Sequence, residues 1–414
     1  MKNRGRFLAL FGGAALLLAA CGEAQQAQGA IKTDFGVTGK TIKLGMLTPL
    51  TGPVAAIGKP LSRGHEVFWK SINEQGGVGG YNVELVTKDT EYKPDVTVQQ
   101  YNAVSKDVLM IEQVLGSQNT EAVKELSKQD KMLMAPASLS SSFAREKYLI
   151  LLAAPYRIQI ENAFEYVVNN QGKKNPKTFI IYQNDEYGLD GKRGYDESIP
   201  AYGLVDVGSA TFKTGDQDFA AQVSQAKNKG AEYVVIVATA ETPRIVGTAA
   251  ALGYKPKWIL QSPSWFTAFK RIPSTIKTFE DDALVFVDTA EWGDTSKPGM
   301  KAMLDNMKKY APDQEPDGFF QFGYSQATVV HAILKKAIEQ RDLTRAGMLK
   351  AFESLKNVDL GGLFPAVTYG TSEKPNERVP SRGSRAWKID RNAPTGLMPI
   401  SEFFTGSVAA KSQF

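Results

Sequence analysis

Residues 41–53 read TIKLGMLTPLTGP, a stretch that begins as a buried β-strand and ends as a turn. The first eight residues are mainly apolar or β-branched, whereas the last five contain two prolines and a glycine, which interrupt strands. The following residues 60–74 place Val67, Phe68 and Ile72 where a helix can bury them. The stretch therefore predicts a strand that leads into a helix, the repeating unit of an α/β fold.

The same alternation of strand and helix continues along the chain. Further apolar runs of strand length lie at 83–88, 109–115, 132–135, 178–182, 233–237, 258–260 and 283–287. Helical stretches lie between them at 120–127, 159–170, 219–229 and 242–252. This alternation predicts parallel sheets with helices on both faces. Because residues 41–414 exceed what one hydrophobic core usually serves, we expect two domains.

The first twenty residues have the features of an export signal. Three basic residues precede an apolar run at 7–18, which is too short to span a bilayer but suits a signal sequence. The run ends in Leu-Ala-Ala-Cys (18–21), which resembles the bacterial lipobox. Cys21 is the only cysteine, so an intramolecular disulfide is excluded and an acyl anchor explains this residue better. The alternative is an ordinary signal with a chance cysteine.

The segments after the signal are expected to be a tether and a nearly neutral soluble body. Residues 21–40 are small and polar, which predicts a flexible tether. Without residues 1–20 the net charge falls from +5 to +2, and no clustered basic block suggests a nucleic-acid partner. We therefore expect an exported protein, periplasmic or at the cell surface, that is anchored to the membrane through lipidated Cys21.

Enzymatic chemistry has little support in the sequence. The two histidines, His65 and His331, lie inside predicted helices, and the single cysteine lies outside the expected fold. Residues 52–60 imitate a phosphate-binding loop, but Pro60 stands where a Ser or Thr would hold magnesium. A Gly-x-Ser-x-Gly elbow is missing. We predict that the chain is not an enzyme and has no catalytic residue, metal site or cofactor.

Two neighbouring strand ends carry small hydroxyl residues. The sequence GSQNT (116–120) follows one predicted strand, and PASLSSS (136–142) follows the next. Ligands of open parallel sheets collect at the carboxyl ends of strands, where helix N-termini favour an anion. The hydroxyls and free N–H groups are therefore candidates for a carboxylate cradle, or they only cap their helices.

Several segments, taken in order and spacing, match a known family. They are TIKLGMLTPLTGP (41–53), INEQGGVGG (72–80), Asp89, APAS (135–138), NDEYG (184–188) and FGYSQA (322–327). Together they resemble the type I periplasmic solute-binding proteins of ABC importers, in the leucine/isoleucine/valine-binding family. The resemblance covers the chain from residue 41 onward and implies two Rossmann-like lobes, joined by a three-segment hinge, that close on a ligand. Lobe one is expected at 41–154 plus 287–357, and lobe two at 155–286 plus 358–414.

The resemblance also assigns residues to the first wall of the site. Ser117 matches the serine that holds the ligand carboxylate, and Ala137 and Ser138 match the donors beside it. Leu139 stands where a threonine hydroxyl is common, so one donor is expected to be missing. Tyr187 matches the tyrosine that lines the site from the second lobe.

The second wall departs from the family pattern at the position of the ammonium counter-charge. Amino-acid binders usually offer a glutamate after the strand at 258–260, but the segment here reads QSPSW (261–265). Either Glu241 or Asp185 replaces it, or the ligand carries no ammonium group, because a buried ammonium without a counter-charge is costly. Ser262 and Trp265 are expected to complete the wall.

The resemblance implies a binding protein that works with an ABC permease and its ATPase. The expected ligand is a branched-chain or other hydrophobic amino acid, with an aromatic or aliphatic carboxylic acid or an amide as the alternative. A sensory receptor of the same fold is the other alternative. The basic, turn-rich segment 369–390 is expected to enter the second lobe as an extended strand pair, with its arginines either at the cleft or in solvent.

Overall fold

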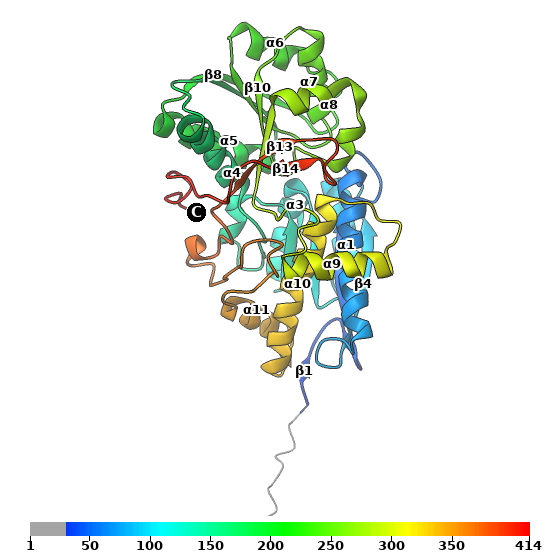
Figure 1. The fold of residues 1–414 in the computed structure, drawn as a ribbon. Helices are drawn as coiled ribbons and strands as arrows, with labels where there is room; N and C mark the ends of the chain where they lie inside the picture. Colours follow the sequence, from blue (N-terminus) through cyan, green and yellow to red (C-terminus); the bar gives the residue numbers. More distant parts are fainter. Residues whose placement is uncertain (1–29) are drawn as a thin grey trace, which may run out of the picture.

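Two separate sheets carry the fold, and they lie one above the other in a computed structural model that describes residues 30–414 (Figure 1). The first sheet has the strand order β2-β3-β5-β6, with β4 beside β3, and β3 to β6 pair in parallel. Its strands are β2 (Val37–Thr38), β3 (Thr41–Thr48), β4 (Asn82–Asp89), β5 (Met110–Leu115) and β6 (Met134–Ala137).

The second sheet has seven strands in the order β14-β13-β11-β10-β9-β7-β8. Strands β7 to β11 are parallel, whereas β13 and β14 add an antiparallel edge. The strands are β7 (Lys177–Gln183), β8 (Val205–Phe212), β9 (Tyr233–Val237), β10 (Lys257–Gln261), β11 (Ala283–Val287), β13 (Arg385–Ile389) and β14 (Leu397–Pro399). The α/β class with two lobes is therefore confirmed.

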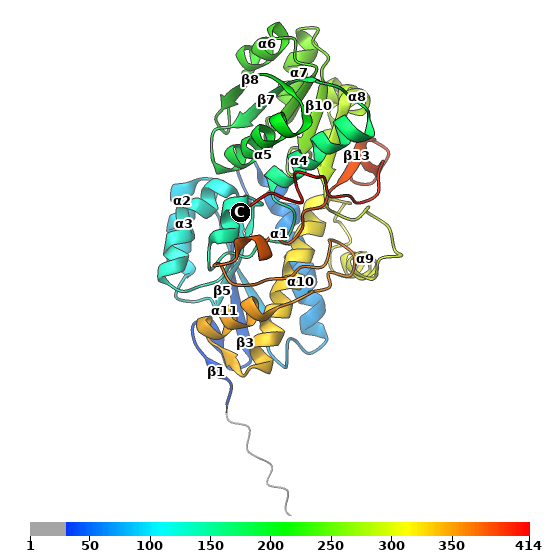
Figure 2. The same ribbon diagram turned by 90° about the vertical axis from the view of Figure 1, so that its left-hand side faces the viewer.

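Helices cover the sheets of both lobes, as Figure 2 shows from the side. The helices of the first lobe are α1 (Ala55–Glu74), α2 (Pro94–Val104), α3 (Ser117–Gln129), α9 (Pro298–Tyr310), α10 (Gly318–Glu339) and α11 (Arg345–Ser354). The helices of the second lobe are α4 (Tyr156–Glu165), α5 (Glu186–Tyr202), α6 (Ala220–Asn228), α7 (Thr242–Ala251) and α8 (Pro273–Asp282). The first lobe thus takes helices from two distant parts of the chain.

Short strands occupy part of the segment that we expected to be a flexible tether. Strand β1 (Lys32–Thr33) pairs in parallel with β12 (Asp342–Leu343), and β2 pairs with β3. The ring of Phe35 lies 4.4 Å from the guanidinium of Arg345. The expectation of a tether up to residue 40 is therefore wrong for 32–38, because backbone pairing and one aromatic contact hold these polar residues to the lobe. The expected signal at 1–20 and Cys21 lie outside the described residues.

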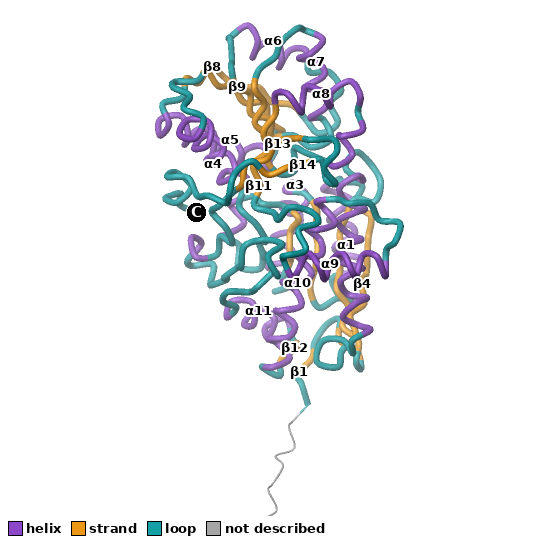
Figure 3. The backbone as a smooth tube through the Cα atoms, in the orientation of Figure 1, coloured by secondary structure: helices purple, strands orange, loops and turns teal. Residues whose placement is uncertain are grey.

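Three segments connect the two lobes (Figure 3). The buried carboxylate of Asp288 links the three by hydrogen bonds. The segments lie between β6 and α4, between β11 and α9, and between α11 and β13. Asp288 of the second segment accepts the Ala154 N–H of the first at 2.8 Å, and the Ser381 hydroxyl of the third also binds it. The three-segment connection is therefore mutually hydrogen-bonded; the numerical limits of the lobes stay a prediction.

Part of the segment 369–390 has a structural role beside the first lobe. The Tyr369 hydroxyl donates to the Leu151 carbonyl at 2.7 Å. The guanidinium of Arg378 is buried and donates to the carbonyls of Ala144, Glu146, Lys147 and Leu149. This arginine therefore lies neither at the cleft nor in solvent, whereas 385–389 enters the second sheet as β13, paired with β14.

Helices α1 and α10 touch backbone to backbone through glycines. A Cβ on Gly323 would lie 2.0 Å from the carbonyl oxygen of Leu61, and one on Gly64 would lie 2.3 Å from that of Phe320. A larger residue therefore fits at neither position unless the helices separate.

We expect Gly323→Ala to lower the free energy of unfolding by about 1–3 kcal/mol, because it forces this contact apart. Urea denaturation of the purified protein measures the change. Gly318→Ala is the matched control in the same helix, since nothing lies within 4 Å of its Cβ position. Equal effects of the two substitutions would contradict the role of the glycine contact.

Candidate ligand-binding site between the lobes

The predicted cradle residues meet at the carboxyl ends of β5 and β6. Ser117 begins α3 directly after β5, and Ser138 follows the end of β6 at Ala137. The two serine hydroxyl oxygens lie 2.6 Å apart and are hydrogen-bonded in a buried position. The parallel pairing of the two strands brings them together, because it sets both carboxyl ends at one edge. The two serines that the sequence placed together therefore lie together, and their role as a carboxylate cradle stays a prediction.

A tyrosine that the sequence analysis did not single out fills this cradle. The Tyr156 hydroxyl is hydrogen-bonded by the Leu139 N–H and by the hydroxyls of Ser138 and Ser117. Burial raises the pKa of Tyr156 to about 12, against these hydrogen bonds, so the phenol stays neutral. Tyr156 is the first residue of α4, directly after Pro155 in the connection between the lobes. The sequence feature that could have predicted this role is a tyrosine in a segment that connects the two lobes.

Tyr187 lines the site with its ring and uses its hydroxyl inside the second lobe. The hydroxyl donates to the Ala238 carbonyl at 3.1 Å and accepts the Gln261 amide N–H at 2.8 Å. It also lies at hydrogen-bond distance, 3.1 Å, from the Ser264 hydroxyl. The ring packs edge-on against Tyr156, with ring centroids 4.7 Å apart. Tyr187 therefore offers a wall rather than a free polar group.

Two adjoining hollows lie between the lobes. The first, which we name the cradle chamber, holds about 490 Å³ of space, part of it open to solvent. Its walls are Ile57, Leu61, Tyr92, Leu115, Gly116, Ser117, Ala137, Ser138, Leu139, Tyr156, Tyr187, Thr239, Ser262, Pro263, Phe319 and Phe322. Six of the eight predicted ligand-binding residues line this chamber.

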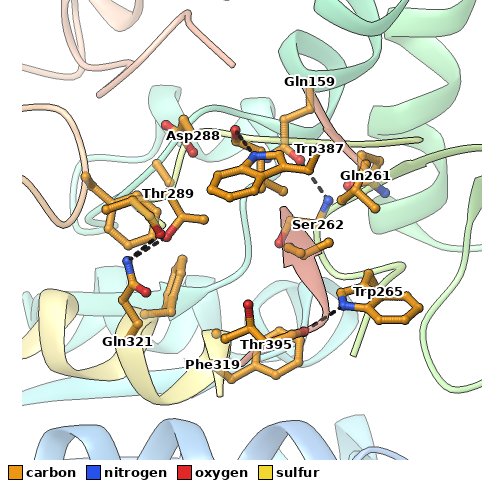
Figure 4. Close-up of a pocket in the computed structure, with 18 of the residues that line it drawn as sticks. Gln159, Gln261, Ser262, Trp265, Asp288, Thr289, Phe319, Gln321, Trp387 and Thr395 are labelled. Carbon is orange, nitrogen blue, oxygen red and sulfur yellow. Dashed lines mark hydrogen bonds between the residues drawn. The ribbon is translucent and has the colours of Figure 1, made fainter. Parts of the chain in front are cut away.

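The second hollow, which we name the aromatic chamber, is larger and holds about 770 Å³, again partly open. It shares Leu139, Ser262, Phe319 and Phe322 with the cradle chamber. Its other walls include Trp265, Val285, Val287, Asp288, Thr289, Gln321, Phe364, Trp387, Thr395 and Leu397 (Figure 4). Trp265 thus lies at the cavity, where its indole N–H donates to the Thr395 carbonyl at 3.1 Å.

The two acids considered as ammonium counter-charges point elsewhere. Glu241 accepts the Gly215 N–H at 2.8 Å and the Thr239 hydroxyl at 3.0 Å. Asp185 caps α5 by accepting the Gly188 N–H at 3.2 Å. Neither is among the residues that line the two chambers. Glu241 is therefore the one predicted ligand residue that the structure does not bring to either chamber.

Asp288 is the only aspartate, glutamate, lysine, arginine or histidine among the described residues that line the two chambers. Its carboxylate is occupied by Ala154 and Ser381 of the lobe connections. Burial raises the pKa of Asp288 to about 6, although these two hydrogen bonds oppose the rise. This acid directly follows the apolar run at 283–287 and was not predicted as part of the site. The chambers therefore present an apolar surface with hydroxyl and amide groups.

The chain belongs to the periplasmic binding protein family, whose sequence pattern residues 41–386 match. It is 29% identical over 199 residues to the Leu/Ile/Val-binding protein homolog 3 of Brucella melitensis. That match covers 47% of this chain and 53% of the relative. The chain thus spans about half the length of the curated relatives it resembles in this way.

Solved structures show the same arrangement over almost the whole chain. A fatty acid ABC transporter substrate-binding protein from Thermomonospora curvata is 26% identical, with a TM-score of 0.86 and coverage of 92% of this chain and 97% of that one. A branched-chain amino acid ABC transporter protein from Thermus thermophilus, solved with bound valine, is 18% identical, with a TM-score of 0.78 and coverage of 91% and 99%. The second likeness shows the fold alone.

These findings confirm the recognised family and the prediction of a binding protein rather than an enzyme. Membership of a periplasmic family implies export. Within residues 30–414, no helix has the length and apolar character needed to cross a bilayer.

We expect the buried carboxyl of Asp288 to make stability depend on pH. Since burial raises its pKa above the ordinary value of 3.8, the folded protein holds this proton more tightly than the unfolded chain. Its contribution to stability therefore falls as the pH rises from about 4 to about 7. Over that range the free energy of unfolding of Asp288→Asn should rise by about 2 kcal/mol relative to wild type.

Urea denaturation of both proteins across this pH range measures the difference. Exposed Leu252 supplies the control Leu252→Ala, which changes no titratable side chain, so its difference from wild type should not depend on pH. A flat difference for Asp288→Asn would show that the carboxyl does not titrate differently on folding.

Proposed function

We propose that this protein is the substrate-binding lipoprotein of an ABC importer, anchored to the membrane through Cys21. It captures a small carboxylate-bearing solute between its lobes and presents the closed form to a permease and its ATPase. This proposal rests on the cavity between the lobes, because a ligand in it contacts residues of both lobes. The family, whose relatives include a substrate-binding protein of a fatty acid ABC transporter, supports it.

Contacts between the lobes describe a closed arrangement. The hydroxyls of Ser140 and Ser142 donate to the Glu186 carboxylate at 2.6 and 2.7 Å. A second contact between the lobes joins Phe266 to Phe319, which pack edge-on with ring centroids 5.4 Å apart. A ligand that binds this form better than an open one shifts the population toward closure.

The ligand that fits this cavity best is an aliphatic or aromatic carboxylic acid, or an amide, without an ammonium group. This choice rests on the position of Glu241. Its carboxylate does not line either chamber, and both of its oxygens are already hydrogen-bonded. An ammonium group would enter an apolar chamber without a free counter-charge, at a cost of several kcal/mol. A branched-chain amino acid is therefore the second candidate, supported by the Leu/Ile/Val-binding relatives.

A transport partner and a sensory partner would both dock on the outer faces of the lobes. We propose transport, because the relatives and neighbours cited above are named for transport or amino-acid binding.

We expect 4-methylpentanoate to bind at least tenfold more tightly than leucine, from which it differs by lacking the ammonium group. Titration calorimetry on purified mature protein measures both affinities, and a thermal-shift assay checks them by ligand stabilisation. The pair 3-phenylpropanoate and phenylalanine repeats the comparison for an aromatic tail. Tighter binding of leucine would restore the amino-acid assignment.

We expect Ser117→Ala combined with Ser138→Ala to weaken carboxylate binding about tenfold or more, because a carboxylate loses two hydroxyl donors. The ligand oxygen is expected to take over donors that now point at the Tyr156 hydroxyl. Exposed Ser296 provides the control Ser296→Ala. Unchanged affinity in a folded double variant would remove the cradle from the site.

A further inference from the structure

We infer that the aromatic chamber is a second ligand subsite that accepts an apolar tail, and that the ligand is a monocarboxylic acid whose tail exceeds the side chain of leucine. This inference rests on the proposed function and names the substrate class of the same site. The carboxylate would lie in the cradle chamber while the tail enters the aromatic chamber.

The two chambers share four lining residues. Leu139, Ser262, Phe319 and Phe322 line both of them, so the boundary between the chambers is mainly apolar, and we infer that a ligand tail crosses it there. Leu139 stands directly after the cradle residue Ser138 and contributes its N–H to the cradle. A ligand head held by that N–H therefore has the Leu139 side chain and the two phenylalanine rings next to its first carbons.

The polar groups on the walls of the aromatic chamber are largely bound to other protein groups. Gln159 donates to the Ala154 carbonyl at 2.7 Å and accepts the Ser262 N–H at 2.8 Å. Gln321 donates to the Thr289 hydroxyl at 2.8 Å. Figure 4 shows the Gln159–Ser262 and Gln321–Thr289 hydrogen bonds beside the cavity. Such groups have little left to offer a second polar head.

The two indole N–H groups on these walls follow the same rule, because both donate to backbone carbonyls. The Trp265 N–H donates to the Thr395 carbonyl at 3.1 Å, and the Trp387 N–H donates to the Val287 carbonyl at 3.4 Å. The exception is Gln261, whose side-chain oxygen is buried without a partner. One acceptor can serve a water or a hydroxyl on the tail, but the wall as a whole suits hydrocarbon.

The chamber closes only when both lobes contribute. Trp387 on β13 and Leu397 on β14 belong to the antiparallel edge of the second sheet, whereas Phe322 on α10 belongs to the first lobe. A tail in this chamber therefore buries its surface against both lobes at once. Filling the chamber stabilises the closed form, so a ligand with a longer tail should bind more tightly until the chamber is full.

A series of saturated acids from butanoate to dodecanoate, titrated into the mature protein by calorimetry, tests this subsite. Each CH₂ buried in the chamber should raise affinity about fourfold until the chamber is full, after which affinity should level off. Val287→Phe narrows the chamber without touching the cradle, so it should move the levelling-off point to a shorter acid. It should leave butanoate affinity within about twofold of wild type, because that ligand does not reach the chamber.

The matched control is Val205→Phe, which makes the same change on an exposed edge strand and should leave the whole series unchanged. A second measurement uses the unaltered chamber: 10-bromodecanoate should quench tryptophan fluorescence. Trp387→Phe should remove part of this quenching, and Trp69→Phe, in the first-lobe core, should leave the quenched amount as in wild type.

The outcomes distinguish the tail subsite from the carboxylate-binding function. Short acids that bind with no gain from added length, or bromide quenching that ignores Trp387→Phe, would overturn the tail subsite and leave the binding function intact. Failure of every carboxylate in the series to bind would overturn the proposed ligand class itself.

Discussion

Buried polar groups that pass between two lobes must find hydrogen-bond partners inside the protein, and the Asp288 carboxylate serves as such a partner for groups of all three connecting segments. Its carboxylate takes the Ala154 N–H from the first connection and the Ser381 hydroxyl from the third. Arg378 of the third connection adds a second set of contacts by donating to carbonyls of the first connection. The relative position of the lobes, and with it the shape of both chambers, depends on these hydrogen bonds.

Sequence reasoning located the elements that are apolar throughout and missed those that are exposed. The strand at 41–48 was predicted with its observed limits, because β3 is buried along nearly its whole length. Strand β8 was missed, because it forms a sheet edge and only one of its eight residues is buried. Helix α1 begins at Ala55, before the proline at which we expected it to start.

The site was predictable where backbone position decides it and unpredictable where side chains reach across the molecule. Ser117 and Ser138 follow neighbouring strands, so topology alone brings them together. The contact of Tyr156 with the cradle depends on the path of the first connection between the lobes. The hydrophobic periodicity of the sequence does not predict the path of a loop. Glu241 had the right charge near a strand end, but its carboxylate accepts the Gly215 N–H and the Thr239 hydroxyl instead of facing the chambers.

The glycine contact between α1 and α10 has a consequence for the order in which the chain folds. Because α10 follows strands β7 to β11 of the second lobe in the sequence, the first lobe stays incomplete until residues 318–339 are present. An emerging polypeptide therefore exposes the unpaired surface of α1 throughout most of its synthesis. Contacts this distant along the chain form slowly, which favours passage through a secretion channel in an unfolded state before the mature shape is reached.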